Sequence, residues 1–240
     1  MSGSVFNVLS IDWDYFIDVD GMFRYHHFPD MPNEKYPKQM QNVVWTSRYS
    51  EDDEILKVGY NPVVHDIMRL IGEVPFVVVA ESHRWIYTYL VQRLRLAGKK
   101  EISLLNLDFH SDFREGAAEL DCGNWLSILM EQHKGDYRWL GWEDSYRDNI
   151  PKRLEFFTDV ERAKSEIKDT AWDMLFICRS DMWSPPHLDA AFTNVFKPFI
   201  DGCNGDIQKG IWDSRYDDEM KKNIQSLKKA MDDFRNRNCP

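Results

Sequence analysis

The chain has 240 residues, of which 43% are hydrophobic and 14% aromatic, which is enough to bury the core of one α/β domain over residues 1–240. Its formal net charge of −10 argues against nucleic acid as a partner, because non-specific binding to nucleic acid requires a basic surface. The same charge favours a cationic substrate. No stretch approaches the roughly 18 consecutive apolar residues of a membrane span, so no membrane association is expected.

The four cysteines lie far apart and form no C-x-x-C pair; they are Cys122, Cys178, Cys203 and Cys239. This spacing is typical of reduced thiols rather than of a disulfide framework. The N-terminus also lacks a signal-peptide pattern. Together these features predict a cytoplasmic protein, and they leave its oligomeric state open.

Strands and helices alternate along much of the chain. In chain order, the pattern predicts a strand at 4–11, a helix at 61–72, a strand at 75–80, a helix at 83–98, strands at 101–107, 154–158 and 173–180, and a helix at 213–237. The runs "PFVVVA" and "SLLNL" are too apolar for a strand with one solvated face and indicate a parallel sheet covered on both sides. The fold class is therefore α/β, a three-layer α/β/α sandwich with a mainly parallel sheet.

Residues 18–60 interrupt this alternation. They are rich in aromatic residues, proline and acids ("DGMFRYHHFPDMPNEKYPKQM") and show little periodicity. A long segment without regular structure in a compact domain is usually functional or disordered. Its many aromatic residues favour an ordered lid or substrate-binding loop.

Three of the predicted strands end in residues that bind metals. "SIDWDYF" carries Asp12 and Asp14, "AESHRW" carries His83, and "LLNLDFHSDF" carries Asp108, His110 and Asp112. In open α/β sheets, ligands bind at the carboxyl ends of the strands, where these side chains can converge. Carboxylates combined with imidazole are ligands that suit a divalent ion such as Mn²⁺, more than they suit a thiolate-type zinc site. The four negative charges of the carboxylates balance the charges of two divalent cations. Two such cations together can bind a water molecule and lower its pKa.

The same segments resemble the arginases and related ureohydrolases. "DFHSD" is similar to their D-A-H-x-D motif, "AESH" to their G-G-D-H-S strand end, and "SIDWDYFID" to their S-x-D-x-D-x-x-D-P. The resemblance extends to the arginase-fold family that includes bacterial peptide arginases, through "GNW" (123–125) and "RSDMWSPP" (179–186). In the arginases the S-x-D-x-D strand comes late in the chain. Its position here at the N-terminus implies a permuted, arginase/deacetylase-like fold.

The resemblance implies an activity and a set of metal ligands. The activity is manganese-dependent hydrolysis of arginine guanidino groups to ornithine and urea by a metal-bridging hydroxide, on a ribosomally made precursor peptide. Two Mn²⁺ ions would be held by Asp12, Asp14, His83, Asp108, His110 and Asp112. Of these, Asp12 and Asp108 would contact both ions, and Asp112 would also hydrogen-bond the hydroxide. His83 and Asp112 would complete one site, and His110 and Asp14 the other.

The remaining roles are matched less completely. Leu126 stands where the arginases have a histidine that moves protons, so the general acid must come from elsewhere, and the candidates are His26 and His27. Glu81 is a candidate for a catalytic role in holding the guanidinium, with Asp181 as a further possibility. Asn124 and Trp125 of the "GNW" segment are candidate substrate-binding residues.

Three alternatives stay open at this point. A single-zinc, deacetylase-like amidohydrolase would leave His83 and Asp112 free of metal. A non-catalytic peptide-binding protein that retained the fold would explain the absence of the proton-moving histidine. A phosphotransferase of the haloacid-dehalogenase type would use Asp12 as nucleophile, although Phe16 stands where that class usually has Thr or Val.

Overall fold

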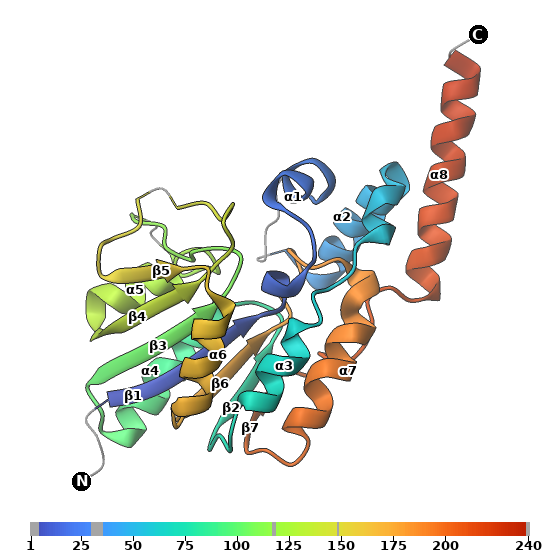
Figure 1. Cartoon of the computed structure of the whole chain (residues 1–240). Helices are drawn as coiled ribbons and strands as arrows, with labels where there is room; N and C mark the ends of the chain where they lie inside the picture. The colour runs from blue at the N-terminus through green and yellow to red at the C-terminus, as the bar shows by residue number, and fades with distance from the viewer. Residues whose placement is uncertain (1–4, 30–35, 117–118, 148, 239–240) are drawn as a thin grey trace.

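The computed structural model describes residues 5–29, 36–116, 119–147 and 149–238. Its strands form one parallel sheet in the order β5-β4-β3-β1-β6-β2-β7 (Figure 1). The strands are β1 (Val5–Asp12), β2 (Val77–Ala80), β3 (Glu101–Leu107), β4 (Lys134–Leu140), β5 (Leu154–Phe157), β6 (Met174–Cys178) and β7 (Gly205–Ile207). The helices are α1 (Gly21–His27), α2 (Lys38–Glu51), α3 (Val63–Leu70), α4 (Trp85–Ala97), α5 (Trp125–Gln132), α6 (Val160–Asp169), α7 (Asp189–Ile200) and α8 (Asp218–Asn238).

Helices cover both faces of the sheet, as expected for a three-layer α/β/α sandwich. Alternate residues of each central strand enter different cores, because successive strand side chains point to opposite faces. In β1, Leu9 and Ile11 pack in the core beneath α3, α6 and α7. Val8 of the same strand packs in the core beneath α4 and α5. The predicted fold class is thus confirmed, whereas the permutation stays a prediction.

Local sequence signals explain where the predicted elements begin and end. All five predicted strands form, as β1, β2, β3, β5 and β6, and the three predicted helices form as α3, α4 and α8. Asn61 accepts a hydrogen bond from the backbone N–H of Val63 at 3.0 Å, which satisfies a free donor at the start of α3. Gly98 ends α4 in the left-handed conformation (φ 64°), which glycine adopts without steric cost.

The expectation of no regular structure across residues 18–60 is wrong. Helices α1 and α2 and a 3₁₀ turn at Asp53–Lys57 lie in this region, and α2 packs against α8. The apolar stripe of α2 is hard to see in the sequence because buried Gln41, Thr46 and Ser50 occupy part of its inner face. Residues 30–35 lie outside the described part of the chain.

Beyond α1 and α2, two strands and three helices were not predicted. The first half of β4 is exposed and polar, and β7 is exposed and has Ile207 as its one large apolar residue, so neither has the apolar run of a central strand. Helices α5, α6 and α7 complete the covering layers.

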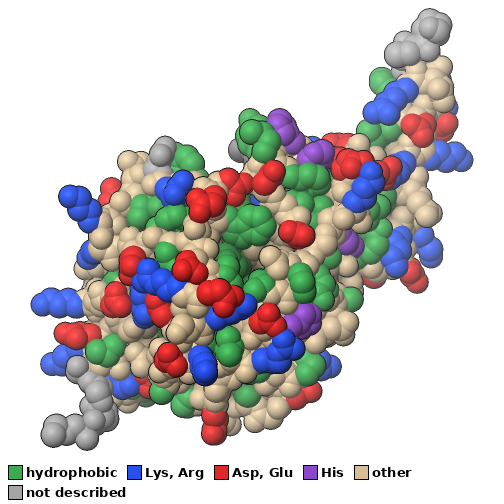
Figure 2. Space-filling model, in the orientation of Figure 1, with side chains coloured by type: hydrophobic (Ala, Val, Ile, Leu, Met, Phe, Trp, Pro, Cys, Tyr) green, Lys and Arg blue, Asp and Glu red, His purple; other side chains and the backbone are tan. Residues whose placement is uncertain are grey.

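The predictions on membrane spans and on cysteines can be compared with the structure. Among the helices of the described ranges, none is long and apolar enough to cross a membrane. Cys122, Cys178 and Cys203 are free thiols, as predicted, whereas Cys239 lies outside the described residues. Acidic and basic side chains are intermingled on the face shown in Figure 2.

The order of the strands creates a position for a ligand. β1 and β3 are neighbours, but the chain leaves β1 towards α3 on one face and leaves β3 towards α5 on the other. At such a switch point, the diverging connections open a crevice beyond the carboxyl ends of the two strands. The end of β1 and the loops after β1 and β3 carry five of the six predicted metal ligands.

Candidate metal centre

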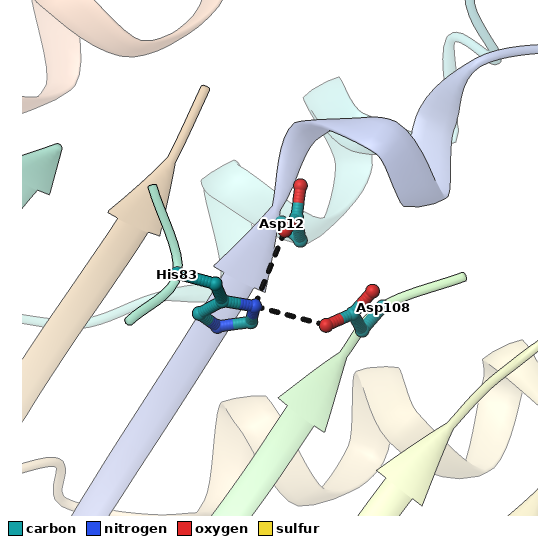
Figure 3. A group of neighbouring side chains, drawn as sticks. All are labelled: Asp12, His83 and Asp108. Carbon is teal, nitrogen blue, oxygen red and sulfur yellow. Dashed lines mark ion pairs between the residues drawn. The ribbon is translucent and has the colours of Figure 1, made fainter. Parts of the chain in front are cut away.

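The six predicted metal ligands come together at the carboxyl edge of the sheet. Asp12 is the last residue of β1, and Asp14 lies in the 3₁₀ turn Trp13–Phe16 that follows. Asp108 directly follows β3, with His110 and Asp112 in the same loop. His83 follows β2 and points towards Asp12 and Asp108 (Figure 3).

The first donor group consists of Asp12, His83 and Asp108. One ring nitrogen, Nδ1 of His83, lies 3.2 Å from Asp12 Oδ2, 2.9 Å from Asp108 Oδ2 and 2.9 Å from Asp112 Oδ2. The other, Nε2, lies 2.7 Å from Ser10 Oγ. An imidazole nitrogen carries at most one hydrogen, so it cannot satisfy three carboxylate oxygens. Despite these short distances, the buried Nδ1 makes no hydrogen bond with any of the described residues. Such convergence of lone-pair donors is the arrangement that surrounds a cation.

The second donor group consists of Asp14, Asp108 and His110. Nδ1 of His110 lies 2.8 Å from Asp14 Oδ2 and 3.9 Å from Asp108 Oδ1. Within each of the two groups, one ligand atom from each residue lies within 4.8 Å of the others. Asp108 belongs to both groups, with a different oxygen facing each histidine. The donors therefore fit two neighbouring divalent cations that share Asp108.

Neighbouring side chains fix the orientation of these donors. The indole Nε1 of Trp125 donates to Asp112 Oδ2, and the Trp125 ring lies 5.0 Å from the His83 ring. The hydroxyl of Ser180 donates to Asp12 Oδ2 at 3.0 Å. Asp112 and Ser180 both have left-handed backbones, with φ of 51° and 57°. This conformation is uncommon outside glycine, and strained residues of this kind concentrate at functional sites.

The centre contains more negative charge than the protein itself neutralises. Burial and the carboxylates of Asp14 and Asp108 raise the pKa of Asp12 to about 7. Burial and the carboxylate of Asp112 raise the pKa of Asp108 to about 8. Burial alone would lower the pKa of His110, but Asp14 raises it to about 9. Because four buried carboxylates face only two imidazoles, bound divalent cations would remove an unfavourable charge imbalance.

The donors form part of the wall of a cavity of about 480 Å³. Its lining includes Asp12, His83, His110, Asp112, Ser180 and Trp183. A second cavity, of about 830 Å³, is lined largely by α1 and by Phe109 and Asp144. The two cavities share His110, Tyr146 and Trp183, so they adjoin at the second donor group.

Three predicted substrate-binding residues lie outside this cavity and have other partners. Glu81 forms an ion pair with Lys38, with Oε2 and Nζ 2.6 Å apart. Both carboxylate oxygens of Asp181 accept hydrogen bonds from Arg179. The buried side chain of Asn124 bonds to backbone groups of its own loop. None of the three is among the residues that line the cavity with the metal ligands.

The fourth substrate-binding candidate, Trp125, is fully buried beneath the donors, where it orients Asp112 and His83 rather than lining the cavity. The candidate general acids are on α1. His26 is exposed and lines the second cavity, whereas His27 Nδ1 lies 2.5 Å from Asp52 Oδ2. Leu126 is fully buried.

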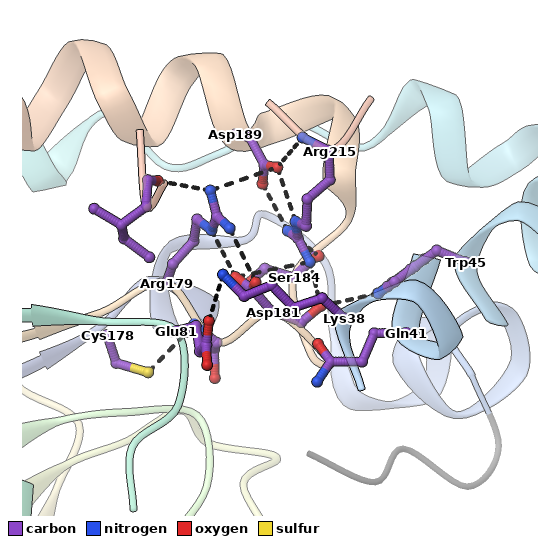
Figure 4. A network of polar contacts seen from close by, with 12 residues as sticks. Lys38, Gln41, Trp45, Glu81, Cys178, Arg179, Asp181, Ser184, Asp189 and Arg215 are labelled. Carbon is purple, nitrogen blue, oxygen red and sulfur yellow. Dashed lines mark hydrogen bonds and ion pairs between the residues drawn. The ribbon is translucent and has the colours of Figure 1, made fainter. Parts of the chain in front are cut away.

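A second buried charged cluster supports the loop that carries Ser180. This cluster, called the arginine network below, consists of Arg179, Asp181, Asp189 and Arg215 (Figure 4). Arg215 also donates to the backbone carbonyls of Asp181 and Ser184. The network was not predicted from the sequence, because Asp189 and Arg215 lie 26 residues apart. The only available signal was the charged "RSD" after an apolar strand.

Comparison of the chain with family models, with curated proteins and with solved structures finds no match. The assignment of the site therefore depends on the residues of this chain alone.

Proposed function

We propose that this protein is a manganese-dependent hydrolase that removes the guanidino group of arginine as urea, within a peptide, and leaves ornithine. The observation that carries the proposal is the pair of donor groups that share Asp108, of which Asp12, His83 and His110 line the cavity. Their mixture of carboxylate oxygens and imidazole nitrogens suits Mn²⁺. When bound at such a site, two divalent cations lower the pKa of water and so supply a nucleophile at neutral pH.

The wall of the cavity is suited to a flat cation. Asp12 and Asp112 contribute negative charge, and Trp183 contributes an aromatic surface. A guanidinium group is planar and weakly hydrated, so it stacks on aromatic rings and pairs with carboxylates. In the proposed reaction Trp183 stacks on the substrate guanidinium, and the negative charge of the cavity wall favours this cation. This recognition replaces the roles expected for Glu81 and Asp181.

Proton movement is assigned to two residues. Asp112, held by Trp125 at the cavity, accepts a proton from the attacking water. The leaving amine of ornithine requires a proton, and His26 is the candidate donor because it lines the adjoining cavity. His27 is less suited, because its Nδ1 already contacts Asp52.

The single-zinc alternative differs in metal count. It requires only one set of donors, whereas the second group adds Asp14 and His110 at hydrogen-bonding distance from each other. Metal analysis of the purified protein separates the two possibilities: two Mn²⁺ per chain support the dinuclear site, and one Zn²⁺ per chain supports the deacetylase-like site.

The activity is tested with Mn²⁺-loaded protein and arginine-containing peptides. We expect urea to be released, together with the mass decrease that accompanies conversion of arginine to ornithine. Free arginine serves as a second substrate and shows whether a peptide is required. The matched control is the same protein after removal of metal with a chelator. A fully metal-loaded protein that releases no urea from any arginine substrate would contradict the proposal.

A further inference from the structure

Arg24 lies outside the donor groups, yet its side chain is turned inward from α1. It is 8% exposed, whereas Met22 and Tyr25 on the same short helix are 65% and 77% exposed. Burial of an arginine is costly unless its charge and its N–H groups are compensated. The partners of Arg24 therefore indicate what the residue does.

The first partner is the turn that carries Asp14. Nη2 of Arg24 donates to the backbone carbonyl of Asp14 at 2.6 Å and to that of Ile17 at 3.2 Å. These two carbonyls lie within and directly after the 3₁₀ turn Trp13–Phe16. One guanidinium nitrogen thus holds the turn that presents Asp14 to His110.

The second partner is the loop that carries His110. The guanidinium carbon of Arg24 lies 4.1 Å from the centre of the Phe109 ring, a cation–π contact. The backbone N–H of Phe109 in turn donates to Asp14 Oδ1 at 3.3 Å. Arg24 therefore contacts both loops of the second donor group, one through a carbonyl and the other through a ring.

The other two guanidinium nitrogens of Arg24 show that filling space is not the reason for an arginine at this buried position. Nε and Nη1 of Arg24 are buried and have no hydrogen-bond partner among the described residues. An apolar side chain would fill the same space without leaving such donors unsatisfied. Burial lowers the pKa of Arg24, and the negative charges of Asp14 and Asp12 oppose that shift, so the acidic centre offsets part of the cost of burying the guanidinium.

We propose that Arg24 is a positioning residue that fixes Asp14 and His110 for the second metal ion. This inference extends the proposed function and depends on the two-metal centre. Gly21, Tyr25 and His26 of α1 line the second cavity. Helix α1 therefore lines this cavity and, through Arg24, also contacts the loops that carry the second donor group.

The test is Mn²⁺ binding by Arg24→Met and Arg24→Lys, measured by calorimetry and by the electron paramagnetic resonance signal of paired Mn²⁺ ions. In Arg24→Met we expect one ion to bind as in the parent protein and the second to bind about 10–100-fold more weakly, the usual effect of removing an outer partner of a metal ligand. The paired signal is lost at ion concentrations that saturate the parent. Arg24→Lys keeps the charge and recovers part of the second affinity.

The matched control is Arg93→Met. Arg93 is also stacked on a phenylalanine, with its guanidinium carbon 3.2 Å from the centre of the Phe76 ring, but it lies on α4. This variant should bind two ions normally. Two ions bound with parental affinity by Arg24→Met would overturn the inference. So would equal weakening of both ions, which indicates general loosening of the fold. Absence of urea release by the fully metal-loaded parent protein, combined with selective loss of the second ion in Arg24→Met, would contradict the proposed function and leave this inference standing.

Discussion

Two buried clusters of charge lie near the same edge of the sheet, and their composition differs. In the arginine network, Arg179 donates to both oxygens of Asp181 at 2.6 and 2.9 Å. Arg215 donates to both oxygens of Asp189 at 2.8 and 2.6 Å. Two cations therefore face two anions in bidentate pairs, which are among the strongest hydrogen bonds in proteins. This cluster is complete without a ligand.

The metal centre, by contrast, is incomplete. Its four carboxylates face two imidazoles, and buried Nδ1 of His83 and Oδ2 of Asp14 have no hydrogen-bond partner in the described part of the chain. Apart from His110, which is partly exposed, the side chains of both clusters are buried, so burial does little to distinguish them. The difference lies in charge balance and in hydrogen bonding. The arginine network is balanced and holds the fold together, whereas the unbalanced cluster is the one that could hold a metal ion.

The largest effect is expected from Asp108→Asn, since Asp108 is the residue that both donor groups share. The substitution keeps the shape of the side chain and removes one negative charge. We expect urea release to fall to background and both Mn²⁺ ions to bind weakly, as measured by calorimetry. Retention of two tightly bound ions in this variant would show that Asp108 is not a shared ligand, and the contrast between the metal centre and the arginine network would then fail.

The opposite behaviour is expected from Asp189→Asn in the arginine network. Removing one partner of a buried ion pair leaves the other charge uncompensated, which costs about 3–5 kcal/mol of stability. Chemical denaturation should show this loss, while the fraction that remains folded still binds two Mn²⁺ ions. Loss of metal binding without loss of stability would mean that the network belongs to the metal centre.

A smaller effect is expected from pH on the metal-free protein. Carboxyl groups whose pKa is raised from 3.8 to about 7 at Asp12 and about 8 at Asp108 bind protons more tightly when folded. Their contribution to stability is present below about pH 4 and is lost as the pH rises through 7 to 8. His83, whose pKa is also raised, acts in the same direction.

The melting temperature in the presence of a chelator should therefore fall between pH 5 and pH 8, as judged from these pKa shifts. Added Mn²⁺ should restore it, most strongly at the upper end of that range, because metal ligands must be deprotonated. The Asp189→Asn protein is the control and should retain the same pH dependence. A metal-free melting temperature that rises over this range would show that the centre is not short of positive charge.

The sequence by itself determined the class of fold and the chemistry of the strand ends. Apolar runs that are buried on both faces can only be central strands of a covered sheet, so β1, β2, β3 and β6 were predictable. Because parallel strands end at the same edge, the six candidate metal ligands could be placed together before any coordinates were known. This reasoning depends on local pattern and on the geometry common to all such sheets.

Only the tertiary structure decided which residues support the donors and which are occupied elsewhere. Glu81 is an acid beside the candidate metal centre, and nothing local shows that Lys38 of α2 already pairs with it. Likewise, the inward turn of Arg24 results from contacts with Asp14 and Phe109. Such pairings join residues from different elements, and their strength depends on distance and burial, which the order of residues along the chain does not specify.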